Sequence, residues 1–392
     1  MTRRVCILTG TRAEYGLLKG VIEGVREHPA LDLSLIVTGS HMSAEHGLTV
    51  REIEADGVPI YERIAILDEG DGDGPAGVAR AMGLALSSLG AAFARIEPDI
   101  LVLLGDRYEI LAAASAALVA TIPVAHIAGG ELTQGAIDDA IRHAVTKLSH
   151  LHFVATEQYR DRVVQLGEDP ARVFVVGGPG SDALSTTPLL DRDQLEQSLD
   201  FRFLPRNLLV TFHPPTLDPG AAHTQMQAML DALDDLDEST GLIFTMPNAD
   251  AGGRALARQL ETWVAGRTCA RLYTSLGHQR YLSTMSVVDG VVGNSSSGLA
   301  EAPSFGIGTV NIGDRQGGRV RAPSVIDCAP ERDAISAAIA RLFSPEFQRI
   351  AQARVNPYGG GETAREIVRI LVEHPLEGLV RKRFHDLPCS PA

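Results

Sequence analysis

Residues 100–109 read ILVLLGDRYE, an apolar run that stops at a glycine and is followed by charged side chains. The same order appears near the N-terminus, where residues 5–18 read VCILTGTRAEYGLL. Short apolar runs that end at glycine and alternate with longer stretches of helical spacing are typical of buried parallel strands joined by crossover helices. These two stretches therefore predict an α/β fold.

The alternation continues through the first half of the chain and starts again after a polar, proline-containing stretch, Ser185–Pro205. In the first half the expected strands are Val5–Leu8, Leu33–Val37, Ile100–Leu104, Val124–Ile127, His152–Ala155 and Val173–Val176. In the second half they are Leu208–Phe212, Leu242–Met246, Gly290–Val292 and Thr309–Ile312. Because ligands bind beyond the carboxyl ends of parallel strands, we expect the functional site in the cleft between two sheets.

Composition excludes several classes of protein. The 392 residues carry 35 Lys and Arg against 49 Asp and Glu, for a net charge of -14. This acidic balance argues against nucleic-acid and membrane-surface partners, which are held by an excess of basic side chains. The longest uncharged stretch, residues 110–125, is shorter than the roughly 20 apolar residues of a membrane helix, so no membrane span is predicted.

Cysteine usage and the N-terminus predict a cytoplasmic protein. The cysteines, Cys6, Cys269, Cys328 and Cys389, form no CxxC pair and indicate neither a disulfide framework nor a zinc site. The first apolar run is too short for a secretory segment. No GxGxxG follows the first expected strand, and no glycine-rich loop ends in Lys-Ser/Thr, which disfavours dinucleotide and P-loop nucleotide binding.

Acidic and basic side chains gather after the expected strands of the first half. They are Arg12, Asp106, Arg107, His126, Glu131 and, if the chain is helical from residue 135 onward, Asp139 and Arg142. Such crowding shifts pKa values, as proton transfer near neutral pH requires. A structural ion-pair network is the alternative interpretation of the same residues.

The segments after the second-half strands have the composition of a nucleotide-diphosphate pocket. They are TFHPPT (211–216) with His213, MPNADAGG (246–253) with Asn248, GNSSSGLAEA (293–302) with Ser295, Ser296 and Glu301, and GDRQGGRVR (313–321) with Arg315. A Gly/Ser-rich turn before a helix can bind phosphates, and a following carboxylate can accept from both ribose hydroxyls. The arginines would compensate the diphosphate charge, unless the last segment is only a solvated basic loop.

Together these motifs resemble the hydrolysing UDP-N-acetylglucosamine 2-epimerases. The resemblance includes TGTRAEYG, GDRYE, HIAGGE with IDDAIRHAVTKLSH, FHPPT, GNSSSGLAEAPS, NIGDRQGGRVR and NPYGGGETA (356–364), and so extends over nearly the whole chain. It implies a glycosyltransferase-B-like α/β fold of two Rossmann-like domains, residues 1–184 and 185–361, with the active site between them. A C-terminal helix, within about residues 362–392, would pack back on the first domain.

The resemblance also implies the reaction. UDP-N-acetylglucosamine would lose its C2 proton and UDP to give a 2-acetamidoglucal, and water would add to yield free N-acetylmannosamine, without metal or nicotinamide cofactor. The pathway would be nonulosonate (sialic or legionaminic acid) biosynthesis, and the assembly a homodimer or homotetramer. The GNSSSG turn differs from the Asp-Ser-Gly-Gly turn of the non-hydrolysing epimerases, which favours the hydrolysing branch.

The roles of single residues follow from the same resemblance. The implied nucleotide contacts are Arg12, His213, Asn248, Ser295, Ser296, Glu301 and Arg315. The implied catalytic carboxylates are Asp106, Glu131 and Asp138 or Asp139, with Arg107, His126 and Arg142 near the sugar.

Other functions stay open at this point. UDP-2,4-diacetamido-2,4,6-trideoxyglucose is an alternative substrate, because no motif reveals which residues contact the sugar at positions 4 and 6. A retaining glycosyltransferase and a non-catalytic nucleotide-sugar-binding protein are alternatives of other classes.

Overall fold

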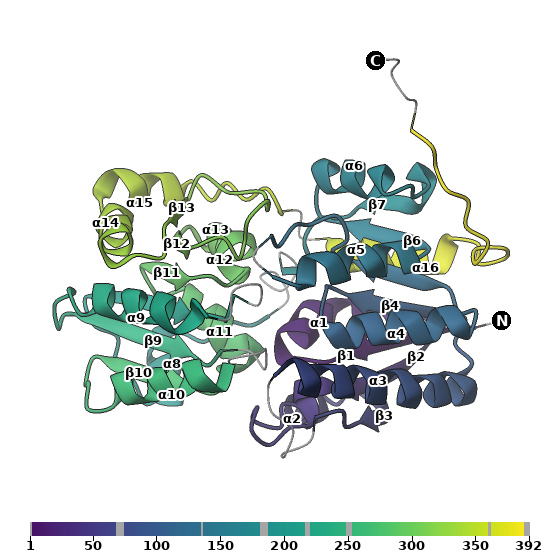
Figure 1. Ribbon diagram of the computed structural model, residues 1–392, viewed down its shortest axis with the longest axis horizontal. Coiled ribbons are helices and arrows are strands. Elements are labelled where there is room, and N and C mark those ends of the chain that lie inside the picture. Colours follow the sequence, from purple (N-terminus) through teal and green to yellow (C-terminus); the bar gives the residue numbers. More distant parts are fainter. Residues whose placement is uncertain are drawn as a thin grey trace.

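The computed structural model describes residues 2–67, 74–134, 136–180, 187–215, 220–247, 253–359 and 362–387. Within these residues two parallel β-sheets lie side by side, each covered by helices (Figure 1). The first sheet has the strand order β3-β2-β1-β4-β5-β6-β7, and the second has the order β10-β9-β8-β11-β12-β13. The expected α/β fold with two Rossmann-like sheets is confirmed.

The strands fall into two sets that are continuous in the sequence. The first sheet comprises β1 (Arg3–Thr9), β2 (Leu31–Thr38), β3 (Ile60–Ile64), β4 (Ile100–Leu104), β5 (Val124–Ile127), β6 (Leu151–Val154) and β7 (Val173–Val175). The second comprises β8 (Arg206–Thr211), β9 (Thr240–Thr245), β10 (Ala270–Tyr273), β11 (Gly290–Gly293), β12 (Gly308–Ile312) and β13 (Val325–Cys328).

Helices connect the strands in both halves. Those of the first half are α1 (Arg12–Glu27), α2 (Val50–Ala55), α3 (Pro75–Ile96), α4 (Tyr108–Val119), α5 (Asp138–Leu148) and α6 (Glu157–Gln165), with short 3-10 helices at Gly39–Met42 and Pro170–Arg172. Those of the second half are α8 (Arg192–Leu199), α9 (Ala222–Leu233), α10 (Gly253–Val264), α11 (Gly277–Met285), α12 (Ser297–Ala300), α13 (Ala302–Phe305), α14 (Arg332–Leu342) and α15 (Pro345–Gln352). The last helix is α16 (Thr363–Glu373).

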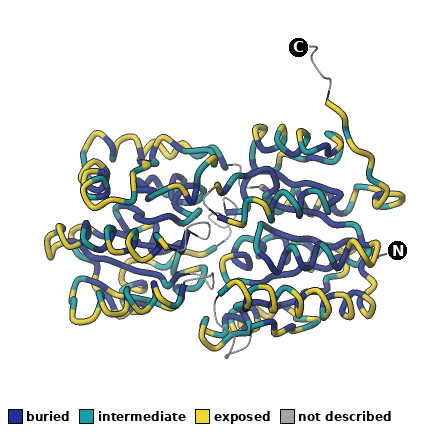
Figure 2. Tube along the Cα trace, in the orientation of Figure 1, coloured by how far each residue is buried: buried dark blue, intermediate teal, exposed yellow. Residues whose placement is uncertain are grey.

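Each expected strand is present, with ends within two residues of the expected ones, but β3, β10 and β13 were not expected from the sequence. All three are edge strands, and each is only partly buried. An edge strand has neighbours on one side alone, so its sequence lacks the continuous apolar run that marks the central strands. Figure 2 shows this contrast between the buried centre of each half and its exposed outer helices.

Helix α16 crosses back from the second half of the chain and packs on α1 (Figure 1). Ile367 and Leu371 of α16 belong to the same apolar core as Leu18 and Ile22 of α1, and each is fully buried. Burial of one such side chain contributes about 1.5–3 kcal/mol. The end of the chain is therefore part of the first half's core.

Helix α3 is, among the described residues, long and apolar enough for a membrane span by length and composition alone. Ala85, Leu89 and Phe93 are buried in one core cluster with residues of β4 and α4. This packing accounts for the buried stripe of α3, but only 28% of its apolar window is buried, and Leu84 and Leu86 are exposed.

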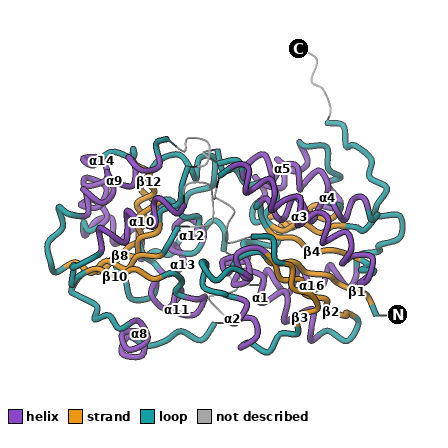
Figure 3. Tube along the Cα trace, turned by 60° about the horizontal axis from the view of Figure 1, so that its bottom comes forward, coloured by secondary structure: helices purple, strands orange, loops and turns teal. Residues whose placement is uncertain are grey.

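Every strand pairing is parallel, so the carboxyl ends of the strands lie at one edge of each sheet. The connections after β1, β4 and β5 therefore start at one edge of the first sheet, and those after β8, β11 and β12 start at one edge of the second. Figure 3 shows the strands in two separate groups with helices and loops between them. The fold thus brings post-strand segments from both halves of the chain toward one another.

Candidate active site

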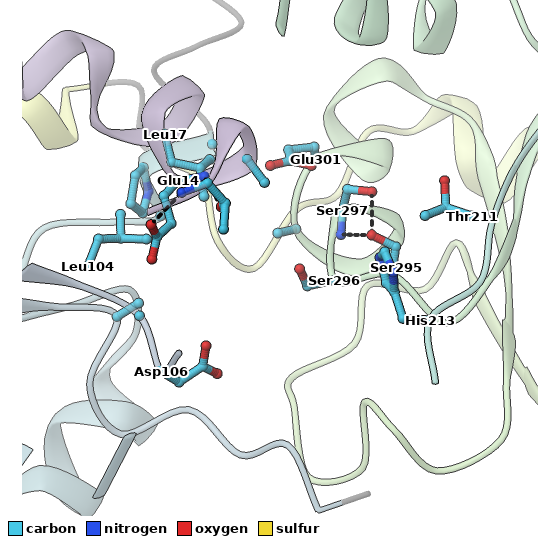
Figure 4. A pocket seen from close by; sticks show the side chains of 18 of the residues that line it. Glu14, Leu17, Leu104, Asp106, Thr211, His213, Ser295, Ser296, Ser297 and Glu301 are labelled. Atoms are coloured by element: carbon cyan, nitrogen blue, oxygen red, sulfur yellow. Dashed lines mark hydrogen bonds between the residues drawn. The ribbon is translucent and has the colours of Figure 1, made fainter. Parts of the chain in front are cut away.

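A cavity of about 270 Å³ lies between the two sheets and is lined by segments that follow their strands. Figure 4 shows residues of the first half on one side of it and residues of the second half on the other. We call the first side the carboxylate wall, which consists of Arg12, Glu14, Asp106, Arg107, Glu131, Asp138 and Arg142. We call the second side the serine wall, which consists of His213, Ser295, Ser296, Ser297, Glu301 and Arg315.

Asp106 lines the cavity and forms an ion pair with the buried Arg142. It follows β4, and its Oδ2 accepts a hydrogen bond from Nη2 of Arg142 on α5. Arg142 is buried and donates through Nη1 to Thr133 Oγ1 at 2.9 Å, whereas 19% of the Asp106 side chain is exposed. The pair gives Asp106 a fixed orientation and leaves its carboxylate accessible from the cavity.

Glu131 lies on the loop after β5 and is buried. The preceding Gly130 has a φ of +78°, and a side chain there would collide with the backbone carbonyl of Tyr159. Oε2 of Glu131 lies 3.1 Å from Nη2 of Arg319, which comes from the loop between β12 and β13. Burial raises the pKa of Glu131, and the Arg319 charge lowers it. Such opposed influences are typical of groups that transfer protons.

The two neighbouring aspartates at the start of α5 differ in position. Asp138 lines the cavity, and Asp139 is not among the residues that line it. Oδ1 of Asp139 accepts from the Thr133 backbone N–H at 2.5 Å, and its Oδ2 lies 3.6 Å from His143 Nε2. Asp139 therefore fixes the loop that carries Glu131 and Thr133.

His126 lies beneath the cavity and is not among its lining residues. Its Nε2 is 2.8 Å from the Gly105 carbonyl oxygen, and its Nδ1 is 3.2 Å from Thr146 Oγ1. Burial lowers the pKa of His126 to about 4, so the imidazole is neutral at pH 7. His126 holds the backbone next to Asp106, which is a different place from the sugar contact expected from the sequence.

Arg12 and Arg107 add positive charge to the carboxylate wall. Arg12 is the first residue of α1, and its Nη1 is buried without a hydrogen-bond partner. Arg107 donates through Nε to Glu109 Oε1 at 2.9 Å. A buried N–H group without an acceptor costs free energy, so Arg12 is prepared to receive an acceptor from a ligand.

Glu14 is a cavity residue that the sequence analysis did not select. Thr11 and Glu14 form a capping box at the start of α1, in which Glu14 Oε2 accepts from the N–H groups of Gly10 and Thr11 at 2.7 and 3.1 Å. Burial, followed by the negative charge of Glu109, raises the pKa of Glu14 to about 8. The T-x-x-E spacing was a visible signal for this residue.

The serine wall is built on a sharp turn after β11. Gly293 has a φ of +136°, and a side chain there would overlap the backbone carbonyl of Thr211. Ser295 Oγ lies 3.1 Å from Ser297 Oγ (Figure 4). Ser297 Oγ also bonds to the hydroxyl of Tyr281. The hydroxyl groups thus gather at one place on the cavity surface.

Asn294, which the sequence analysis passed over, joins the other parts of the serine wall. Its Oδ1 accepts from the His213 N–H at 2.7 Å, and its Nδ2 donates to the His213 carbonyl oxygen at 2.8 Å. Its own carbonyl oxygen accepts from Arg315 Nη1 at 3.3 Å and from Gln316 Nε2 at 2.9 Å. Asn294 therefore fixes His213 through its side-chain amide and Arg315 through its backbone carbonyl, next to the serine turn.

Glu301 closes the serine wall at the end of α12. Burial raises its pKa to about 7. The side chain packs on Gly180 of the first half, where an added Cβ would lie 2.8 Å from Oε1. Asn248, the remaining nucleotide contact expected from the sequence, lies outside the described residues.

Among the described residues no group of three or more His, Cys, Asp or Glu side chains could hold a metal ion. The acidic groups of the carboxylate wall instead have arginine partners, Arg142 for Asp106 and Arg319 for Glu131.

Comparisons with known proteins identify the family. A "GDP/UDP-N,N'-diacetylbacillosamine 2-epimerase (hydrolyzing)" of Campylobacter jejuni is 39% identical over 387 residues, which are 98% of this chain and 99% of that protein. "Polysialic acid biosynthesis protein P7" of Escherichia coli is 35% identical over 98% of both chains. The crystal structure of UDP-GlcNAc 2-epimerase from Neisseria meningitidis bound to UDP-GlcNAc superposes with a TM-score of 0.80 at 19% identity, over 95% of this chain and 100% of that one.

The structural likeness confirms the glycosyltransferase-B-like fold that the sequence motifs predict. Residues 23–372 match the family described as UDP-N-acetylglucosamine 2-epimerase. This match covers most of the chain, and the C. jejuni relative is named as a hydrolysing enzyme. The chain therefore belongs to the UDP-N-acetylglucosamine 2-epimerase family.

Proposed function

We propose that this chain converts a UDP-linked 2-acetamido-2-deoxyglucose into UDP and the free sugar with the manno configuration. The observation that carries the proposal is a single cavity with buried carboxylates on one wall and hydroxyl and guanidinium donors on the other. A proton transfer that expels a diphosphate requires both kinds of group at one place.

The proposed reaction has two steps. In the first, a carboxylate takes the C2 proton, the electrons of the C2–H bond form a C1–C2 double bond, and the C1–O bond breaks as UDP leaves with the electron pair. In the second, the electron pair of the C1–C2 double bond takes a proton at C2 on the opposite face, the oxygen of a water molecule bonds to C1, and a carboxylate accepts the proton that this water releases. We assign the two proton transfers to Asp106, Glu131 and Asp138, and the support of their loop to Asp139.

The serine wall would bind UDP. Ser295, Ser296 and Arg315 present the donors that a diphosphate requires, and charge-assisted hydrogen bonds of this kind are the strong ones. His213 is held on the same frame through Asn294. Glu301 is placed to accept from the ribose hydroxyls, and the unpartnered N–H of Arg12 supplies a donor from the opposite wall.

Two donors are candidates for the sugar. The name of the 39% identical relative favours UDP-2,4-diacetamido-2,4,6-trideoxyglucose, whose sugar is N,N'-diacetylbacillosamine. The name of the 35% identical relative favours UDP-N-acetylglucosamine, the precursor expected for a sialic acid. Either product would enter nonulosonate biosynthesis.

Turnover of both donors in heavy water tests the proposal. We expect proton NMR to show UDP and a free manno-configured sugar that carries deuterium at C2, with the faster donor identifying the substrate. Release of a free sugar that keeps a proton at C2 would contradict the elimination. Transfer only to an added acceptor would indicate a glycosyltransferase, and binding without turnover would indicate a nucleotide-sugar-binding protein.

A further inference from the structure

The loop between β12 and β13 reaches both walls of the cavity with two arginines four residues apart. Arg315 stays on its own half and donates to the carbonyl oxygen of Asn294. Arg319 crosses to the first half, where its Nη2 lies 3.1 Å from Glu131 Oε2 and its Nε donates to the Leu132 carbonyl oxygen at 3.1 Å. The two guanidinium groups therefore have different partners, although one loop carries both.

The contact between Arg319 and Glu131 is largely buried at the edge of the cavity. The two side chains are each only 10% exposed. Nη2 of Arg319 is also 3.5 Å from Thr133 Oγ1, the atom that accepts from Arg142. Arg319 thus contacts the same loop that Arg142 and Asp139 hold from the other side.

The backbone on both sides of Arg319 is fixed against the first half. Gly318 has a φ of +79°, and an added Cβ would lie 2.5 Å from Leu132 Cδ1, so only glycine permits this approach. On the other side, the Val320 N–H donates to the Tyr159 hydroxyl at 3.1 Å, and the Val320 carbonyl oxygen accepts from the Tyr358 hydroxyl at 2.9 Å. This frame leaves Arg319 little freedom to turn away from Glu131.

The geometry points to Arg319 as a positioning residue for Glu131, supplied by the proposed nucleotide-binding half of the chain, which holds that carboxyl group in place for proton transfer. This inference rests on the proposed function. Arg319 differs in this role from Arg315, which faces the serine wall.

Several charged and titratable groups surround Glu131. These groups are Arg319, Arg142, Asp138, Tyr159, Tyr358 and, at the Gly130 carbonyl oxygen, Arg162. Burial raises the pKa of Glu131 and Arg319 opposes that rise. Without the Arg319 charge, a larger fraction of Glu131 is protonated, and a protonated carboxyl group cannot accept the C2 proton.

The test uses the full-length protein with Arg319→Gln, Arg319→Lys and the control Arg332→Gln. Arg332 lies on α14 of the same half, pairs with Asp235 at the surface, 2.5 Å from Nη2 to Oδ1, and does not line the cavity. The first measurement is the titration of Glu131 by carboxyl carbon NMR, with Glu131→Gln identifying the signal. An adjacent Arg lowers a carboxyl pKa by about 1–3 units, so Arg319→Gln should move the midpoint upward by that amount.

The second measurement is turnover and UDP affinity as functions of pH. Arg319→Gln should lower kcat about tenfold to hundredfold at pH 6, since misplaced reacting groups cost factors of this size. Part of the loss should return at higher pH. UDP affinity should fall by less than kcat, because the Arg319 charge also lowers the pKa of Glu301 on the serine wall. Arg319→Lys should restore part of the rate, and Arg332→Gln should behave as the parent protein.

Two results would overturn the inference. An unchanged Glu131 titration in Arg319→Gln would show that Arg319 does not control the carboxylate. A loss of UDP affinity as large as the loss of kcat in both variants would make Arg319 a nucleotide ligand instead. If the parent protein turned over neither UDP-sugar, the proposed function would fail, whereas the Glu131 titration would still decide the role of Arg319.

Discussion

The two walls of the cavity solve different physical problems. On the carboxylate wall, Asp106 and Glu131 are charged groups in low-dielectric surroundings, and each has an arginine that comes from a distant part of the chain. On the serine wall, neutral hydroxyls stand on a turn that Asn294 and Gly293 fix through the backbone. Proton transfer needs carboxylates with adjusted pKa values, whereas diphosphate binding needs donors at fixed positions. The difference predicts that changes on one wall affect turnover and changes on the other affect binding.

The largest expected effect comes from the carboxylate wall. Glu131→Gln and Asp106→Asn keep the shape of the side chains but remove the proton-transfer group. Loss of one positioned acid or base costs about 10²–10⁴-fold in rate, so turnover should fall by that factor. UDP affinity, measured by calorimetry, should stay close to that of the parent protein.

Near-parental turnover of both variants would contradict the assignment of turnover to the carboxylate wall. The arginine contacts would then form a structural ion-pair network. Assay of the two variants with added 2-acetamidoglucal can further separate the two half-reactions, because these need not use the same carboxylate.

The reciprocal change on the serine wall should affect binding. Arg315→Ala removes a charged donor at the proposed diphosphate position, and a hydrogen bond to a charged group is worth about 1.5–3 kcal/mol. Calorimetry should show UDP binding weaker by about tenfold to 150-fold. Arg332→Ala on α14 is the control, because Arg332 pairs with Asp235 at the surface and does not line the cavity. Equal UDP affinity of Arg315→Ala and the parent protein would move the diphosphate site elsewhere.

Local patterns in the sequence predict the central strands and most of the residues on the two walls. The central strands and the carboxylates that follow them, such as Asp106 and Glu131, are marked by apolar runs that end in charge. The partner of Glu131 is not marked, because Arg319 lies in the other half of the chain and only the tertiary fold brings the two together. The sequence analysis places Arg319 in the arginine-containing segment 313–321 that would compensate a diphosphate, whereas in the structure Arg319 pairs with Glu131.

The sequence also does not predict the direction in which individual side chains point. Asp138 and Asp139 are adjacent in chain order, and the exact first turn of α5 decides that Asp138 lines the cavity while Asp139 holds Thr133. His126 sits in a strand, and its side chain points to the buried interior, where it bonds to Thr146. A residue type that is suited to catalysis gives no information about which side of a strand it occupies.

A smaller effect should follow from Glu301. Its pKa is raised to about 7 by burial, so the carboxylate is protonated at pH 6 and ionised at pH 8. If the ribose hydroxyls donate to the ionised form, affinity should rise by about tenfold over that range, because one pKa unit corresponds to about 1.4 kcal/mol. Glu301→Gln should bind with the low-pH affinity of the parent and lose this part of the pH dependence. The measurement is best made with a UDP-sugar and a Glu131→Gln background, which prevents turnover.

The smallest expected effect concerns Glu14, which lies on the carboxylate wall but has backbone N–H groups as its partners. Its pKa is raised to about 8 by burial and by Glu109, whereas an unfolded glutamate titrates near 4.5. Between these two values the folded state holds a proton that the unfolded state has released, so this group makes the protein less stable as pH rises from about 5 to 8.

Glu14→Gln removes that ionisation, and its amide oxygen can still accept from the Gly10 and Thr11 N–H groups. Urea unfolding should therefore show a variant whose free energy of unfolding exceeds that of the parent by an amount that grows as the pH rises from 5 to 8. Glu157→Gln is the control, because Glu157 occupies the first turn of α6 and is exposed. If the stability curves of Glu14→Gln and the parent ran parallel across this pH range, Glu14 would not be protonated in the folded protein, and the carboxylate wall would hold one more negative charge than we infer.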